Sequence, residues 1–98
     1  MLVLIAKLQA RAGSAAEVAA GLREMVAASR QEPGTLAYGF CQEQDQFVVT
    51  EYYRDEAAYQ AHKDSAALKA FRAKVAGHLE GSPEHWLSSL QDGFGFGA

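Results

Sequence analysis

The chain has 98 residues, of which 49% are hydrophobic and 21% are charged, and its formal net charge is -3. This length suits one domain, and this balance is typical of a globular protein. No apolar run approaches the roughly 20 residues that a helix needs to cross a bilayer. The nine basic residues are spread along the chain without the cluster that binds a phosphate backbone. We therefore expect neither a membrane nor a nucleic acid as partner.

The cysteine and histidine content limits the chemistry further. Cys41 is the only cysteine, which excludes an internal disulfide and a cysteine-based zinc site. His62, His78 and His85 lack the close spacing of a metal motif. These observations predict a cytoplasmic protein without a structural metal. We expect Cys41 to be a small buried side chain, and we expect His78 and His85 to lie at the surface or at a strand end, outside any site.

The first third of the chain predicts a strand and then a helix. Residues 2–9 alternate loosely between apolar and polar types, as a half-buried strand does. Ser14 follows a turn and has the character of an N-cap, with Glu17 at the capping-box position. From residue 15 to about residue 30, apolar side chains recur every three or four positions, which predicts a helix. Glu32-Pro33-Gly34 ends that helix.

The middle of the chain predicts two antiparallel strands. Residues 35–42 and 47–53 alternate, and the polar residues 43–46 form the turn between them. The second strand is apolar on both sides, with Phe47, Val49 and Tyr53 on one side and Val48 and Tyr52 on the other. A sheet that is apolar on both faces needs a partner, and we expect that partner to be a second copy of the chain.

The last third predicts a broken helix and a fourth strand. Asp55 is expected to cap a helix that runs to about His62, and Asp64-Ser65 is expected to break it or cap a second one. A final strand is predicted over 85–90, and residues 93–98 form a Gly- and Phe-rich tail that we expect to be flexible. The order βαββαβ predicts one domain over 1–92, with an α+β, ferredoxin-like fold built on a four-stranded antiparallel sheet.

Glu51 and His62 are the candidate catalytic residues. Glu51 lies in the most apolar strand and His62 in the helix that follows, so both can face the same interior. Histidine accepts a proton near neutral pH, and a carboxylate beside it can orient its tautomer. The alternative is that His62 only caps its helix while Glu51 pairs with Arg54 or Lys63. The aromatic residues expected to bind a substrate, or else to fill the core, are Tyr38, Tyr53, Phe71 and Trp86.

Three segments resemble a known family, the antibiotic biosynthesis monooxygenase domain, whose small members include quinol monooxygenase-like proteins. They are residues 29–38, residues 51–59, and residues 62–65 followed by Phe71. With the order of the elements, they extend the resemblance from residue 2 to about residue 90. The resemblance implies a dimeric α+β barrel, in which two protomers pack sheet to sheet and each keeps a pocket between its sheet and its helices.

The resemblance also implies an activity: oxidation of a small hydroquinone- or phenol-like substrate by dioxygen, without a cofactor. The protein then binds the ring, removes its proton and shields the anion from water. The alternatives are a proton-transfer isomerase of a small metabolite and a non-catalytic protein that binds an aromatic or polyketide-like ligand. Isomerases of phosphorylated sugars would need basic residues in the pocket. Haem-degrading relatives use an Asn, a Trp and a His where this chain has Ala6, His62 and Phe71, so haem is not expected.

Overall fold

The structure is a computed structural model that describes residues 1–95. It contains four strands and three helices over that part of the chain. In chain order they are β1 (Leu2–Gln9), α1 (Ala15–Ser29), β2 (Thr35–Glu43), β3 (Gln46–Tyr53), α2 (Glu56–Lys63), α3 (Ala66–Val75) and β4 (Glu84–Ser89). The predicted order of elements is confirmed, and the break predicted at Ser65 separates α2 from α3.

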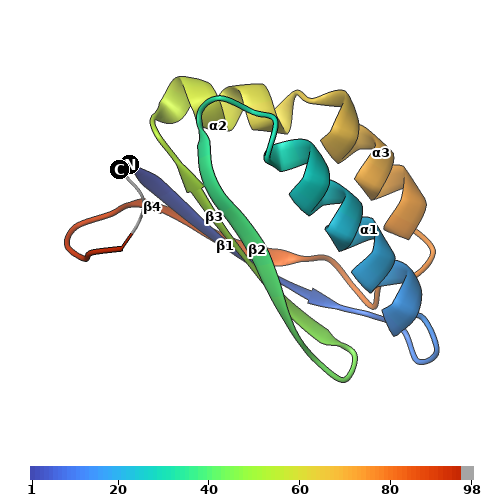
Figure 1. Ribbon diagram of the computed structural model, residues 1–98. Helices are drawn as coiled ribbons and strands as arrows, with labels where there is room; N and C mark the ends of the chain where they lie inside the picture. Colours follow the sequence, from blue (N-terminus) through green and yellow to red (C-terminus); the bar gives the residue numbers. More distant parts are fainter. Residues whose placement is uncertain (96–98) are drawn as a thin grey trace.

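The four strands form one antiparallel sheet in the order β2-β3-β1-β4. All three helices lie on the same side of this sheet, and α1 packs beside α3 (Figure 1). This arrangement confirms the predicted α+β, ferredoxin-like fold. One face of the sheet is therefore covered by helices, which we call the inner face, while the outer face is not covered by any element in residues 1–95.

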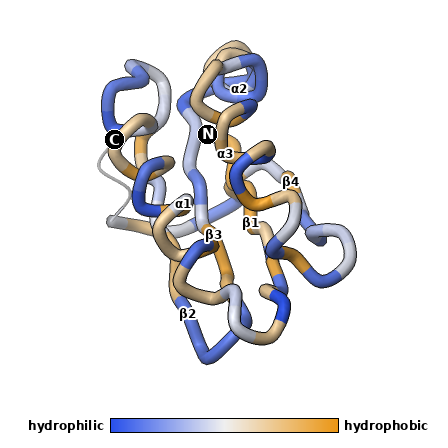
Figure 2. Tube along the Cα trace, turned by 90° about the vertical axis from the view of Figure 1, so that its right-hand side faces the viewer, coloured by the Kyte–Doolittle hydropathy of each residue, from blue (hydrophilic) through white to orange (hydrophobic). Residues whose placement is uncertain are grey.

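The core lies between the inner face and the helices. Phe47 and Val49 on β3 are buried against Val18 and Leu22 of α1 and against Leu8 of β1. Figure 2 shows the hydrophobic residues along β1 and β3 and the hydrophilic turn between β2 and β3. Because side chains alternate along a strand, the same segment of β3 points every second residue into this core.

Helix α1 approaches α3 closely at Gly21. A Cβ atom built on Gly21 would lie 3.2 Å from the ring of Phe71 and 3.2 Å from Val75. Glycine costs roughly 1 kcal/mol relative to alanine inside a helix, so its presence here reflects the space that the Phe71 ring needs. This contact fixes α3 over the inner face of the sheet.

The helix starts are capped as predicted at two of three positions. Asp55 accepts a hydrogen bond from the Ala58 amide at 2.9 Å, and Ser65 accepts one from the Leu68 amide at 3.1 Å. The predicted capping by Ser14 is wrong. Its hydroxyl is hydrogen-bonded to Nδ1 of His78 at 2.9 Å, and its backbone does not have the extended conformation that an N-cap side chain requires.

The outer face carries exposed apolar side chains. Trp86 is 60% exposed, and Ile5 and Val48 are exposed to 39% and 38%. Cys41 is also exposed, so the prediction that it is buried is wrong: Cys41 pairs with Val48 and shares its side of the sheet. No helix within residues 1–95 combines the length and the apolar character that a bilayer span requires. The predicted flexible tail lies partly outside the described residues, which end at Gly95.

Candidate active site

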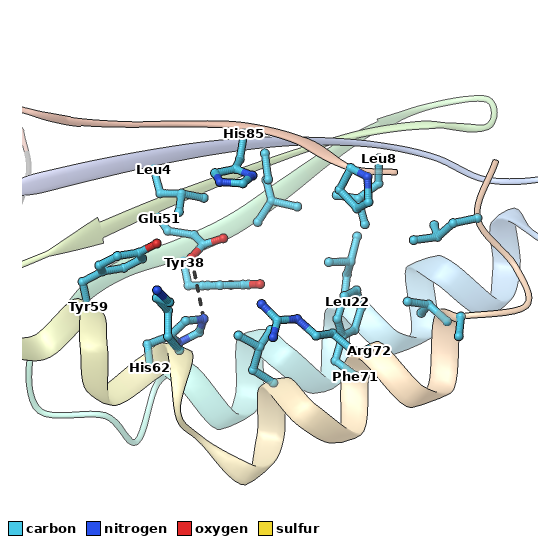
Figure 3. Close-up of a pocket in the computed structure, with 18 residues that line it drawn as sticks. Leu4, Leu8, Leu22, Tyr38, Glu51, Tyr59, His62, Phe71, Arg72 and His85 are labelled. Carbon is cyan, nitrogen blue, oxygen red and sulfur yellow. Dashed lines mark ion pairs between the residues drawn. The ribbon is translucent and has the colours of Figure 1, made fainter. Parts of the chain in front are cut away.

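A cavity of about 510 Å³ lies between the inner face of the sheet and helices α2 and α3 (Figure 3). Its walls are mainly apolar and include Leu4, Leu22, Val49 and Phe71. The polar side chains that line it are Tyr38, Glu51, Tyr59, His62, Lys63, Arg72 and His85. An apolar cavity with a few converging polar groups is typical of a small-molecule site.

His62 lies between two carboxylates. Its ring is buried, with 3% of the side chain exposed. Nδ1 lies 2.9 Å from Oε1 of Glu32, and Nε2 lies 3.6 Å from Oε1 of Glu51. The alternative that His62 only caps its helix is therefore wrong, because both ring nitrogens face acidic side chains inside the protein.

The segment after α1 holds Glu32 in this position. Gly34 is buried so close to α2 that an added Cβ would overlap the Cβ of Ala58. The Gly34 carbonyl accepts a hydrogen bond from the Arg54 amide at 2.9 Å. The Thr35 hydroxyl donates to Oε1 of Glu32 at 2.7 Å. The sequence predicted only a helix stop here, whereas the turn also directs the Glu32 carboxylate at the histidine.

Glu51 is a buried carboxyl group at the floor of the cavity. Loss of water around it raises its pKa above the usual range, and the hydroxyl of Tyr53 and the ring of His62 partly offset this shift. The Tyr53 hydroxyl donates a hydrogen bond to Oε1 of Glu51. Burial, and next the charge of Glu51, raise the pKa of both Tyr38 and Tyr53, so both phenols stay protonated. The cavity therefore presents the Tyr38 hydroxyl, a hydrogen-bond donor, and the carboxyl group of Glu51.

Four of the six predicted site residues meet at the cavity. They are Glu51, His62, Tyr38 and Phe71, and the rings of Tyr38 and His62 have centroids 5.6 Å apart. Tyr53 points to the same side but is fully buried behind Glu51, so it supports the site without lining the cavity.

Trp86 lies on the opposite side of the sheet, and its predicted place in the cavity wall is wrong. It pairs with Ile5, and both side chains are exposed on the outer face. The neighbouring His85 is exposed near the start of β4, as expected, but it pairs with Ala6 and lines the cavity, so the expectation that it stands outside the site is wrong. Alternation along β4 places the two side chains on opposite faces, and nothing in the local sequence indicates which one faces inward.

Sequence reasoning also missed two basic residues of the cavity, Lys63 and Arg72. A usable signal was present for Arg72, since the cavity-lining residues of α3 and the turn after it are spaced like one helical stripe: Leu68, Phe71, Arg72, Val75, Ala76 and Leu79. No three His, Cys, Asp or Glu side chains in residues 1–95 are arranged to hold a metal ion.

The sequence of this chain matches one family model. That model is described as antibiotic biosynthesis monooxygenase and matches residues 1–74. The chain belongs to this family. The matched residues include His62 and the two carboxyl groups that lie beside its buried ring, those of Glu32 and Glu51.

Solved structures of similar proteins share the fold over nearly the whole chain. PA3566 from Pseudomonas aeruginosa is 29% identical, with a TM-score of 0.85 over 93% of this chain and 94% of that one. NE2512 from Nitrosomonas europaea, a protein of unknown function, is 28% identical, with a TM-score of 0.86 over 95% and 91%. A structure described as an antibiotic biosynthesis monooxygenase is 26% identical, with a TM-score of 0.86 over 94% and 100%. No functionally curated protein matched the sequence.

Proposed function

We propose that this protein is a cofactor-independent monooxygenase that oxidises a small hydroquinone- or phenol-like substrate with dioxygen. The observation that carries the proposal is the buried Glu51–His62 pair at the floor of an apolar cavity. Membership of the antibiotic biosynthesis monooxygenase family supports it. A cavity of about 510 Å³ falls in the range of small-molecule sites and has room for an aromatic ring.

In this proposal the pair removes a proton from the substrate hydroxyl. The proton passes to the Glu51–His62 pair, and the electron-rich anion that remains reduces dioxygen. For a hydroquinone, one oxygen atom enters the ring, the other leaves as water, and the product is a hydroxyquinone. The substrate supplies all the electrons, so the balance needs no further reductant. The apolar walls keep water away from the anion, and Tyr38 offers a protonated hydroxyl beside it.

Glu32 is the positioning residue for His62 in this mechanism. Its carboxylate accepts the Nδ1 proton of the imidazole, and this bond leaves Nε2 directed toward Glu51 and the cavity. The sequence had suggested Glu51 for this orienting role. The shorter distance to Glu32, 2.9 Å against 3.6 Å, supports giving the role to Glu32 and leaving Glu51 as the acidic group that reaches the substrate.

An oxygen electrode and a panel of hydroquinones test the function. Protein freed of metal and flavin should consume dioxygen when a suitable hydroquinone is added. Ligand-detected NMR on the same panel shows which compounds bind. Compounds that bind without any oxygen uptake would support the non-catalytic alternative and contradict the oxygenase. Trp86 fluorescence is a poor probe of the cavity, because that side chain lies on the other side of the sheet.

The second candidate is a proton-transfer isomerase that uses the same Glu51–His62 pair on a small anionic metabolite. Lys63 and Arg72 in the cavity lining favour it, since such a substrate needs basic contacts. The isomerase would exchange a substrate C–H proton with solvent deuterium under anaerobic conditions, which NMR detects. The monooxygenase consumes dioxygen instead.

We also propose that two copies pair through their outer sheet faces. The exposed Ile5, Val48 and Trp86 lie on this face, and residues 1–95 provide no element to cover them. A second copy offers the same apolar face, so the contact is self-complementary under a twofold axis. Sedimentation equilibrium at micromolar concentration decides the point, and a stable monomer there would contradict the proposal.

A further inference from the structure

The charge of the cavity differs from the charge of the whole chain. The chain carries a net charge of -3, but Glu51 is the only carboxylate among the cavity-lining residues. Against it stand two basic side chains, Lys63 and Arg72, and two histidines, His62 and His85. Lys63, Arg72 and His85 lie on the exposed side of the cavity, where a cluster of basic groups attracts a ligand that brings negative charge.

Arg72 is the cationic group with the most direct access to a ligand. Figure 3 shows its side chain running along the cavity toward Tyr38 and His62. Within residues 1–95 it has neither a hydrogen bond nor an ion pair. Two other basic residues differ from it in this respect, because Lys74 pairs with Glu24 at 2.6 Å and Arg54 pairs with Asp55 at 3.4 Å. Arg72 is exposed, and its guanidinium donors therefore remain available to a ligand at the open side of the cavity.

Lys63 is less available than Arg72. Its Nζ lies 5.3 Å from the centre of the Tyr59 ring, which is a cation–π contact at the cavity edge. Arginine also presents a planar fork of donors that matches the two oxygens of a carboxylate, whereas lysine is a single point charge. The stronger and more directional anion contact is thus expected at Arg72, with Lys63 adding longer-range attraction.

We propose that the substrate is a hydroxylated aromatic carboxylate, whose carboxylate binds Arg72 while its ring lies against Phe71 and its hydroxyl reaches the Glu51–His62 pair. The part about the hydroxyl rests on the proposed function; the part about the carboxylate does not. Arg72 is exposed, so water solvates its guanidinium when the ligand is neutral, and a neutral hydroquinone gains no charge-assisted contact there. An aromatic carboxylate makes that contact and keeps the apolar ring that the walls require.

The test compares two ligands of nearly equal shape, 4-hydroxybenzoate and 4-hydroxybenzamide, by NMR titration under anaerobic conditions near neutral pH. The wild-type protein should bind the carboxylate about tenfold more tightly than the amide, or better, as expected for a charge-assisted contact. Arg72→Gln should remove this preference. Lys69→Gln is the matched control, because it removes one positive charge from the same helix at an exposed position outside the cavity lining, and it should keep the preference.

Arg72→Lys provides a second variant that keeps the charge and loses the fork. It should show an intermediate preference, and it serves in place of Arg72→Gln if the latter folds poorly. Equal affinity for the two ligands in the wild type, a preference that survives in both variants, or no binding of either ligand up to roughly 10 mM would each overturn the proposal. Because no turnover is measured, an absent oxygen uptake would overturn the proposed function and leave this result intact.

Discussion

The two faces of the sheet differ in chemistry although the same strands build them. On the inner face of β3 every second residue is buried, and this set includes Glu51 and Tyr53. On the outer face of the same strand, Gln46 and Val48 are exposed, Thr50 and Tyr52 are half-buried, and none of the four is a charged residue type. On β3 the inner face thus holds an ionisable group, Glu51, where water is excluded, and the outer face holds the apolar Val48 where water is present.

This inversion supports the proposed function, which places the reaction on the inner side of the sheet. A buried carboxyl group is costly unless it is hydrogen-bonded, and Glu51 is retained with Tyr53 and His62 around it. An exposed apolar face is costly unless it is covered, and none of the elements in residues 1–95 covers it. Each face therefore supports a different part of our proposal: binding of a small molecule on the inner side and pairing with a second copy on the outer side.

The largest effect is expected at His62. Replacing it by Gln keeps a side chain that can bond Glu32 but removes the group that accepts a proton. Turnover should fall by about 10²–10⁴-fold, as is usual when a general base is removed, while the melting temperature changes little. His78→Gln is the matched control, since His78 bonds Ser14 away from the cavity. Equal turnover in His62→Gln and the wild type would remove His62 from the mechanism.

The outer face is tested by Val48→Lys. Val48 lies directly opposite Lys7 on β1, so the variant places two like charges side by side in a dry sheet-to-sheet contact, and the dissociation constant of the dimer should rise by roughly 30-fold or more, equivalent to ~2 kcal/mol. Gln42→Lys adds the same charge on the adjacent strand at an exposed position whose partner, Phe47, faces inward, and it should leave the dimer unchanged. Sedimentation equilibrium on both variants measures the difference, and equal dissociation constants would place the contact elsewhere.

The turn that supports the site is tested by Gly34→Ala. The added methyl group overlaps Ala58 and pushes the Glu32 segment away from α2, so the free energy of unfolding should fall by about 1–3 kcal/mol. That loss lowers the melting temperature by roughly 5–15 °C in a domain of this size. Gly77→Ala is the control, because a Cβ there meets no atom within 4 Å. Similar melting temperatures for the two variants would show that the turn can relax.

The smallest effect concerns the pH dependence of stability. Burial raises the pKa of Glu51, so the folded state favours the protonated form of this side chain. The stability linked to this group is fully present below the usual carboxyl range and is lost as the pH rises through the raised pKa. The Gln in Glu51→Gln cannot ionise. The difference between the melting temperature of the variant and that of the wild type should therefore shift in favour of the variant by a few degrees as the pH rises from roughly 4 to roughly 8. Parallel curves for the two proteins would contradict the assignment of this shift to Glu51.

Much of the fold could be predicted because local signals agreed with the final structure. The alternation of residues 47–53 and the caps at Asp55 and Ser65 all act within a few residues of chain, and the structure keeps them. Ser14 shows where such reasoning fails. Its hydroxyl bonds His78, 64 residues away, in place of a backbone amide of its own helix. The residues around Ser14 cannot predict a contact with so distant a partner.

The site was predictable only in part, for the same reason. Glu51 and His62 could be paired because one follows the other across a single turn. Glu32 lies 30 residues before His62, and its role depends on how tightly Gly34 packs on α2. Trp86 was misplaced because an aromatic residue in an edge strand suits either face, and only the register of β4 on β1 decides between them.

The alternation of β3 also limits how this protein can evolve. Substitutions at inward positions change the lining of the cavity, and substitutions at outward positions change the exposed face of the sheet, with little interference between the two. A deletion or insertion of one residue in β3 is different, because it moves every following side chain to the other face. Glu51 would then point to the outer face and Tyr52 into the cavity. We therefore expect relatives to vary freely in the residues of this strand but very little in its length.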